Sequence, residues 1–292
     1  RLMENKQYES AYLLVAKHMQ KEGLGFAQAE FLAGWLALRK VDKPWRAFEH
    51  FEALYHRTVT PVSKARGAYW TARASEALGH PDIARQWYQI AAKHQMVYYG
   101  QLALSVLSKE HQPPEQLPPK ITIEGKNKFH SLELVQVIDI LHRAGLRDET
   151  EKFFIALENS LEIPEYFRLA AEKAQKMKYN YHALRIAKKA LKKNIYLVEQ
   201  TYPTVVSKMK NVDLEWALVH AIIRQESAFN DRAKSPAGAL GLMQLMPSTA
   251  KEVARKLGYN YQASWLTKYP HHNIKLGTAY FEQLLDQFGG SY

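Results

Sequence analysis

The chain has 292 residues, and its 40 Lys and Arg residues outnumber its 29 Asp and Glu residues, which gives a formal net charge of +11. Because it has no cysteine, a disulfide framework, a thiol nucleophile and a cysteine-ligated zinc site are excluded. No apolar run reaches the roughly 18 residues of a transmembrane helix, and no His-Glu-x-x-His metal motif occurs. A chain of this length can hold two or three hydrophobic cores.

The first part of the chain contains an internal repeat. Gly-Trp-Leu-Ala at residues 34–37 returns 35 residues later as Tyr-Trp-Thr-Ala, and Pro44, Ala47 and Phe51 return 37 residues later as proline, alanine and tyrosine. Small residues at helix contacts, aromatic residues between helices and a period of this length are typical of a tetratricopeptide-like solenoid. We therefore predict an α-superhelical domain over residues 1–119, in which most Trp and Tyr side chains pack between helices.

A second helical domain is predicted over residues 120–199. Residues 111–119 hold four of the twelve prolines and indicate a boundary. Helical periodicity then resumes over residues 126–144, 147–159, 164–176 and 182–193. No segment shows the period-two alternation of a strand, so the predicted fold class is all-α.

Positive charge is concentrated before residue 200. Residues 1–199 carry +8 of the net charge, and residues 172–193 contain eight Lys or Arg and one acidic residue. Such a cluster attracts a polyanion, and nucleic acid is one polymer of this kind. A solvated helix face explains the segment equally well.

One carboxylate lies at the end of an apolar helix. Apolar residues recur with helical spacing from Leu214 to Ile223, with Asp213 as the N-cap, and most of the helix surface is expected to be buried. Glu226 then stacks over Ile222 and Ile223. We expect these neighbours to desolvate Glu226 in part and to favour the protonated form that a general acid needs.

A glycine-bearing loop follows this carboxylate. Gly238 and Gly241 are expected to adopt positive φ or to let a ligand approach the backbone. The next helix is predicted to start at Pro247, with Thr249 and Glu252 as a capping box, and to end near residue 258. The loop therefore presents amide N–H groups, a serine hydroxyl and a glutamine side chain to the carboxylate.

This ordered set of motifs resembles the lysozyme-like lytic transglycosylases of bacteria, in particular the soluble type with a helical superhelix before the catalytic domain. Glu226-Ser227 corresponds to the family's catalytic Glu-Ser pair, and residues 235–247 correspond to its Gly-Leu-Met-Gln motif. Its Asn-Ile-x-x-Gly-x-x-Tyr element corresponds to Asn273, Ile274, Gly277 and Tyr280. The family's later Tyr-Asn-Ala-Gly motif has no counterpart, so the resemblance implies a truncated lysozyme-like α-helical catalytic domain at residues 200–292.

The resemblance also implies the residues of the site. It makes Glu226 the catalytic residue, with no cofactor and no metal. The residues that it implies for substrate binding are Ser227, Ser235, Gly241, Met243, Gln244, Met246 and Tyr280. Taken singly, a glutamate at a helix end is more often a surface residue, and Met243 and Met246 are more often core filler.

The scarcity of acidic residues near Glu226 supports in part a reaction with one carboxylate. Most glycosidases use two carboxylates about 5 to 9.5 Å apart, but Asp231 and Glu252 are the only other acids between Gln225 and Gly258. Neither has a family counterpart as nucleophile. The resemblance implies that Glu226 cleaves the β-1,4 bond between N-acetylmuramic acid and N-acetylglucosamine, with help from the substrate's N-acetyl group, and closes a 1,6-anhydro ring.

The resemblance implies a setting as well. Peptidoglycan glycan strands are the expected partner, other cell-wall enzymes are further candidates, and nucleic acid is not expected. The chain begins at Arg1 without a charged-then-apolar leader, which fits a mature fragment. A periplasmic monomer is the expected form.

Alternative functions remain open at this stage. A non-catalytic helical-repeat scaffold would account for residues 1–199 but gives no reason for the Glu-Ser and Gly-Leu-Met-Gln motifs. A goose-type hydrolytic lysozyme shares the glutamate helix and differs in the nucleophile. A nucleic-acid binder is the weakest alternative, because no recognised motif accompanies the basic cluster.

Overall fold

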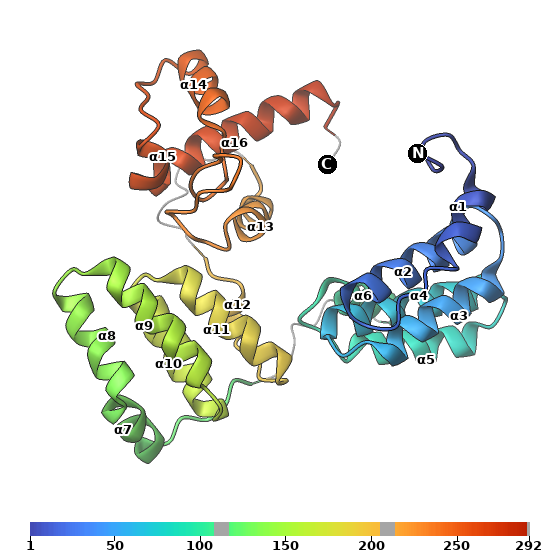
Figure 1. Cartoon of the computed structure of the whole chain (residues 1–292), viewed down its shortest axis with the longest axis horizontal. Helices are drawn as coiled ribbons and strands as arrows, with labels where there is room; N and C mark the ends of the chain where they lie inside the picture. Colours follow the sequence, from blue (N-terminus) through green and yellow to red (C-terminus); the bar gives the residue numbers. More distant parts are fainter. Residues whose placement is uncertain (108–116, 205–213, 291–292) are drawn as a thin grey trace. The chain divides into compact units, whose positions relative to one another are not determined.

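A computed structural model describes residues 1–107, 117–204 and 214–290. Helices and loops make up these residues, and the only β-type pairings within them are isolated bridges from Leu240 to Lys234 and to Leu245. The predicted all-α fold class is therefore confirmed. The chain divides into two compact units, Arg1–Gln116 and Leu117–Tyr292 (Figure 1). No helix in the three ranges is long and apolar enough to cross a bilayer.

The first unit is a series of antiparallel helices that carries the repeat. Pro44 and Pro81 occupy the first turns of equivalent helices, where proline is favoured. A Cβ atom at Gly34 would lie 2.6 Å from the ring of Phe51, so glycine allows two successive helices to approach closely. The helices are α1 (Tyr8–Val15), α2 (Gly23–Arg39), α3 (Pro44–Arg57), α4 (Pro61–Ala77), α5 (Pro81–Ala92) and α6 (Tyr98–Leu107).

The second unit begins with a group of helices around a phenylalanine-rich core. Phe129, Phe154 and Phe167 are fully buried there. The predicted helix over residues 126–144 is wrong, because Leu132 takes an extended conformation with ψ of 131° and divides it in two. The helices are α7 (Ile123–Ser131), α8 (Glu133–Arg143), α9 (Arg147–Ser160), α10 (Pro164–Lys176), α11 (Asn180–Lys192) and the short α12 (Val198–Thr201).

Four helices follow in the same unit: α13 (Trp216–Glu226), α14 (Pro247–Lys256), α15 (Trp265–Lys268) and α16 (Pro270–Gln287). The helix α14 starts at Pro247 and ends before residue 258, as predicted. Its predicted capping box is wrong, because Met246 is the N-cap residue and Glu252 instead pairs with Lys256 at 3.0 Å. Asp213, the predicted N-cap residue of this helix, lies outside the described residues. The N-cap residue of α13 is Glu215.

The burial of α13 is narrower than its sequence predicts. Only Val219 and Ile223 of this helix are buried, and Trp216 is exposed. The prediction that most of its surface is buried is therefore wrong. The two buried residues share a cluster with Leu184 of α11, so α11 and α13 pack into one core.

Domain boundaries remain a prediction. Most of the proline-rich segment at residues 111–119 lies outside the described residues. We therefore propose a division into three domains at residues 1–119, 120–199 and 200–292. The second and third of these domains share a core, because Leu184 of α11 packs in the same cluster as the buried residues of α13.

Candidate functional site

A pocket of about 500 Å³ lies where the end of α13 and the loop after it meet α11. Four of the predicted site residues line it: Glu226, Ser227, Ser235 and Gln244. The other lining residues are Tyr181, Lys188, Arg224, Gln225, Ala228, Asn230, Ala233 and Lys234. The motifs that are separate in the sequence thus meet at one hollow.

Glu226 is the last residue of α13 and is exposed. The predicted desolvation of its side chain is wrong, because Ile223 one turn earlier points into the core while the helix end opens onto the pocket. The chain then turns sharply, since Ala228 and Phe229 have φ of 50° and 63°. Two successive non-glycine residues in the left-handed region are strained. Phe229 is buried at this turn, and its packing holds the strained backbone in place.

Ser235 and Gln244 shape the loop that faces Glu226. Ser235 Oγ accepts a hydrogen bond from the Ala239 amide at 3.0 Å, and a hydroxyl that accepts one bond can still donate another. Gln244 has φ of 46°, and its Nε2 donates to the Gly241 carbonyl at 2.9 Å. These bonds hold both side chains at the edge of the pocket.

Four predicted binding residues lie outside the pocket lining: Gly241, Met243, Met246 and Tyr280. Met243 is buried, and a Cβ atom at Gly277 would lie 2.4 Å from its sulfur. Met246 is the exposed N-cap residue of α14. Tyr280 packs against the cluster that α14 and α16 form. Their predicted contacts with substrate stay predictions.

Two glycines in the loop provide a matched test of backbone geometry. Gly238 and Gly241 have φ of 91° and 75°, a region that disfavours alanine by about 1–2 kcal/mol. A Cβ atom at Gly241 would also lie 2.1 Å from the Leu266 carbonyl oxygen, whereas at Gly238 it would meet nothing within 4 Å.

Alanine at Gly241 should therefore destabilise the chain more than alanine at Gly238. We expect Gly238→Ala to lower the free energy of unfolding by about 1–2 kcal/mol, and Gly241→Ala to lower it by about 1–3 kcal/mol more, the usual effect of overpacking. Urea unfolding followed by circular dichroism measures both. Equal losses would show that the contact with Leu266 does not constrain the loop.

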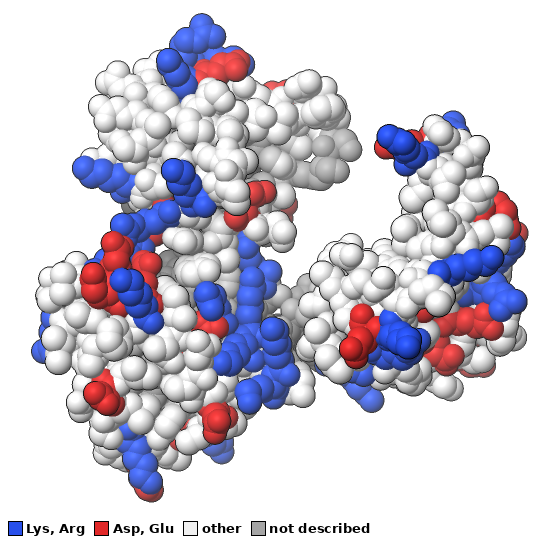
Figure 2. Space-filling view, viewed as in Figure 1, with Lys and Arg blue, Asp and Glu red and all other residues white. Residues whose placement is uncertain are grey.

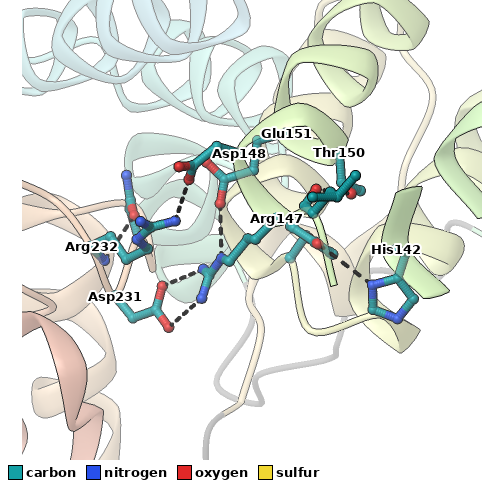
Figure 3. Close-up of polar contacts among 10 residues, drawn as sticks. His142, Arg147, Asp148, Thr150, Glu151, Asp231 and Arg232 are labelled. Carbon is teal, nitrogen blue, oxygen red and sulfur yellow. Dashed lines mark hydrogen bonds and ion pairs between the residues drawn. The ribbon is translucent and has the colours of Figure 1, made fainter. Parts of the chain in front are cut away.

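Two crossed ion pairs join the loop after α13 to the start of α9 (Figure 3). Arg147 donates to both carboxylate oxygens of Asp231, with Nη2 to Oδ1 at 2.6 Å and Nη1 to Oδ2 at 3.4 Å. The next residue along each segment forms the second pair, Arg232 with Asp148. Bidentate pairs constrain geometry more than single contacts do. They tie the loop to α9 and turn the Asp231 carboxylate toward that helix.

Four further polar residues of the pocket lining were not predicted from the sequence: Tyr181, Lys188, Arg224 and Lys234. Lys188 lies on α11, outside the predicted catalytic domain, and belongs to the basic cluster of residues 172–193. Partial desolvation beside the pocket lowers the pKa of Lys188, and the charge of Arg224 lowers it further. The basic cluster was the only feature of the sequence that pointed to Lys188. The spacing of residues along the chain does not show that α11 lies beside the end of α13.

The fold and the site together define a class of protein, a helical-repeat superhelix followed by a lysozyme-like helical domain with a glutamate at a helix end. Comparison with known proteins supports this class of protein. Residues 204–292 match the family model described as the transglycosylase SLT domain. A Haemophilus influenzae protein classed with the soluble lytic murein transglycosylases is 29% identical over 254 residues, which is 82% of this chain and 40% of that protein.

Solved structures show the same similarity. Lytic transglycosylase Slt from Pseudomonas aeruginosa, solved as an inactive mutant with one glutamate replaced by glutamine, matches 98% of this chain and 46% of its own with a TM-score of 0.78 and 25% identity. The 70 kDa soluble lytic transglycosylase of Escherichia coli has the same fold, with a TM-score of 0.62 and 20% identity over 98% of this chain and 52% of its own. Residues 204–292 are therefore identified as a transglycosylase SLT domain, and the chain as a whole is similar to the soluble lytic transglycosylases. It spans about half the length of these structures and 40% of the Haemophilus relative.

Proposed function

We propose that this chain carries the catalytic glutamate of a peptidoglycan lytic transglycosylase, and that the glutamate is Glu226. One observation carries the proposal: among the described residues around the pocket, Glu226 is the only carboxylate. Asp231, the nearest acid along the chain, is bound by Arg147, and Glu252 pairs with Lys256 on α14. This arrangement supports a mechanism with a single acid rather than the usual pair of carboxylates.

The proposed reaction uses Glu226 twice. The protonated carboxyl group first donates its proton to the glycosidic oxygen between N-acetylmuramic acid and N-acetylglucosamine, and the bond from this oxygen to C1 breaks. The substrate's N-acetyl group stabilises the positive charge that develops at C1, as in other substrate-assisted glycosidases. The carboxylate then removes the proton of the 6-hydroxyl, whose oxygen bonds to C1 and closes the 1,6-anhydro ring. No water is consumed.

The loop supplies the polar groups that such a reaction needs. Ser227, Ser235 and Gln244 line the pocket beside Glu226, and we assign them to binding the saccharide. Gly241, Met243, Met246 and Tyr280 are assigned on the motif resemblance alone. We further propose a periplasmic monomer whose partner is the murein glycan strand, with other cell-wall enzymes as additional partners.

The products distinguish this reaction from hydrolysis. Mass spectrometry of muropeptides released from purified sacculi should show products that are one water lighter than those of a hydrolase. The same sacculi digested with a hydrolytic lysozyme provide the reference masses. Products that carry the additional water would replace the proposal with the lysozyme alternative.

A further inference from the structure

The turn directly after Glu226 is strained. Ala228 and Phe229 have φ of 50° and 63°, and such conformations persist only where the surrounding structure holds them. The Asn230 amide donates to the Ser227 carbonyl at 3.0 Å, so the turn closes immediately behind Glu226. A shift of this turn would therefore displace the Glu226 carboxylate.

The segment that forms this turn continues to the opposite side of the pocket. The Ala233 carbonyl accepts hydrogen bonds from the Gly241 amide at 2.8 Å and from Gln244 Nε2 at 3.3 Å, and Gln244 lines the pocket. Residues 228–233 thus connect Glu226 with the loop that faces it. The contacts that hold the middle of this segment therefore help to set the separation of the two sides of the pocket.

The helix α9 holds the middle of this segment. Arg147, the first residue of α9, forms the bidentate pair with Asp231, and Asp148 pairs with Arg232 (Figure 3). The side chains of Arg147 and Asp231 are 38% and 21% exposed, so solvent and salt screen this pair less than a surface pair. The pair of Asp148 and Arg232 is more exposed and is expected to contribute less.

The helix α9 is a rigid anchor for these contacts. Its Phe154 is fully buried in the phenylalanine-rich core. Arg147 is oriented by two further contacts, because its Nε donates to Glu151 at 3.0 Å and its guanidinium lies 5.6 Å from the centre of the Tyr179 ring. Acidic and basic side chains lie next to one another over α9, whereas Lys and Arg side chains gather over α11 (Figure 2). The loop thus meets partners of both signs at α9.

We propose that Arg147 and Asp231 are positioning residues for the reaction at Glu226. Through this ion pair, the helical domain before the catalytic domain holds the turn that carries the acid. Arg147 lies outside residues 204–292, the range of the transglycosylase domain model, so the catalytic geometry depends on a residue that this domain does not contain. Arg147 and Asp231 lie outside the pocket lining and act through the turn. The inference rests on the proposed function of Glu226.

A pair of matched substitutions in the full chain tests this role. Asp231→Asn removes the charge and keeps the size of the side chain. Asp139→Asn makes the same change in a pair that joins α8 to α10 through Lys173 and includes no residue of the loop. Steady-state release of anhydro-muropeptides from soluble murein strands gives kcat and KM for both variants.

We expect Asp231→Asn to lower kcat about fivefold to fiftyfold, because small displacements of a catalytic group cost up to about 10²-fold in rate. Its KM should change by less than about twofold, since an interaction that acts only on the transition state lowers kcat and leaves KM unchanged. Asp139→Asn should keep both values within about twofold of the parent chain.

Variants of Arg147 show whether the two residues act as one unit. Arg147→Gln should lower kcat to the level of Asp231→Asn, and the double variant should lower it by less than about twofold more, because residues of one pair are not additive. Arg147→Lys keeps the charge but loses the bidentate geometry, so it should recover part of the kcat that Arg147→Gln loses.

Amide hydrogen exchange measures the turn in the absence of substrate. Peptides that span residues 226–235 should exchange severalfold faster in Asp231→Asn and at the parental rate in Asp139→Asn, because loss of an external contact favours local opening. Peptides from α9 and α10 should exchange at the parental rate in Asp231→Asn, which would show that the fold is kept.

Each outcome supports or overturns the inference. Unchanged kcat and exchange in Asp231→Asn, or an equal loss of kcat in Asp139→Asn, would overturn the positioning role. A loss confined to KM would assign Asp231 to substrate binding, and additive losses in the double variant would separate the two residues; both results overturn it. A parent chain that released no anhydro-muropeptides would instead show that the proposed function is wrong, and the inference would fall with it.

Discussion

Replacing Glu226 with glutamine should lower the release of anhydro-muropeptides by at least about 10²-fold, because general acid–base catalysis alone contributes about 10²- to 10⁴-fold. Glutamine has nearly the same shape and cannot give or take the proton. Since Glu226 is exposed, the free energy of unfolding should change by less than about 0.5 kcal/mol. Product release from purified sacculi and urea unfolding measure the two quantities.

A matched control is available for this variant. Glu252 is another exposed glutamate, in the middle of α14, and it lies outside the pocket lining. Glu252→Gln removes a surface ion pair with Lys256, so its turnover should stay within about twofold of the parent chain. Near-normal turnover by Glu226→Gln would remove this residue from the chemistry, and an equal loss in both variants would point to a general effect of charge.

The second large effect is expected at Asn273, which is fully buried. Its Oδ1 accepts from the Met243 amide at 2.8 Å, and its Nδ2 donates to the carbonyls of Leu240 at 2.8 Å and Leu266 at 3.1 Å. Asn273→Ala leaves these three backbone groups without their partner, and each unsatisfied buried group costs about 1–3 kcal/mol. We expect the free energy of unfolding to fall by about 3 kcal/mol or more.

Activity should fall with stability in this variant, because the bonds of Asn273 hold the Gly-Leu-Met-Gln segment against α16. Asn260→Ala makes the same chemical change at an exposed position and should shift stability by less than about 0.5 kcal/mol. Urea unfolding and turnover on sacculi measure both variants. A loss of less than about 1 kcal/mol for Asn273→Ala would show that the loop holds its conformation without this side chain.

Local features of the helices and of the loop could be predicted from the sequence. The starts of α3, α5, α10 and α14 at proline follow from a residue that fixes φ and lacks an amide donor. The positive φ of Gly238 and Gly241 follows from the steric freedom of glycine. The break at Leu132 could not be predicted in this way, because no proline or glycine marks it and tertiary packing overrides its helical pattern.

Burial was harder to predict than helicity. The spacing of residues 214–226 shows which side chains share a face, but it does not show whether another element covers that face. In the structure α13 buries Val219 and Ile223 and leaves Trp216 exposed. For the same reason Glu226 lies in an open pocket, although the apolar residues one turn earlier suggested that it would be desolvated.

The helical class, the repeat and the order of the Glu-Ser, Gly-Leu-Met-Gln and Asn-Ile motifs could be read from the sequence, since all of these depend on residue type and spacing along one segment. Which residues meet at the pocket depends on tertiary packing. Lys188 and Glu226 are 38 positions apart, and Arg147 and Asp231 are 84 apart. Contacts over such separations depend on how helices pack, and the periodicity of a single helix carries no record of its neighbours.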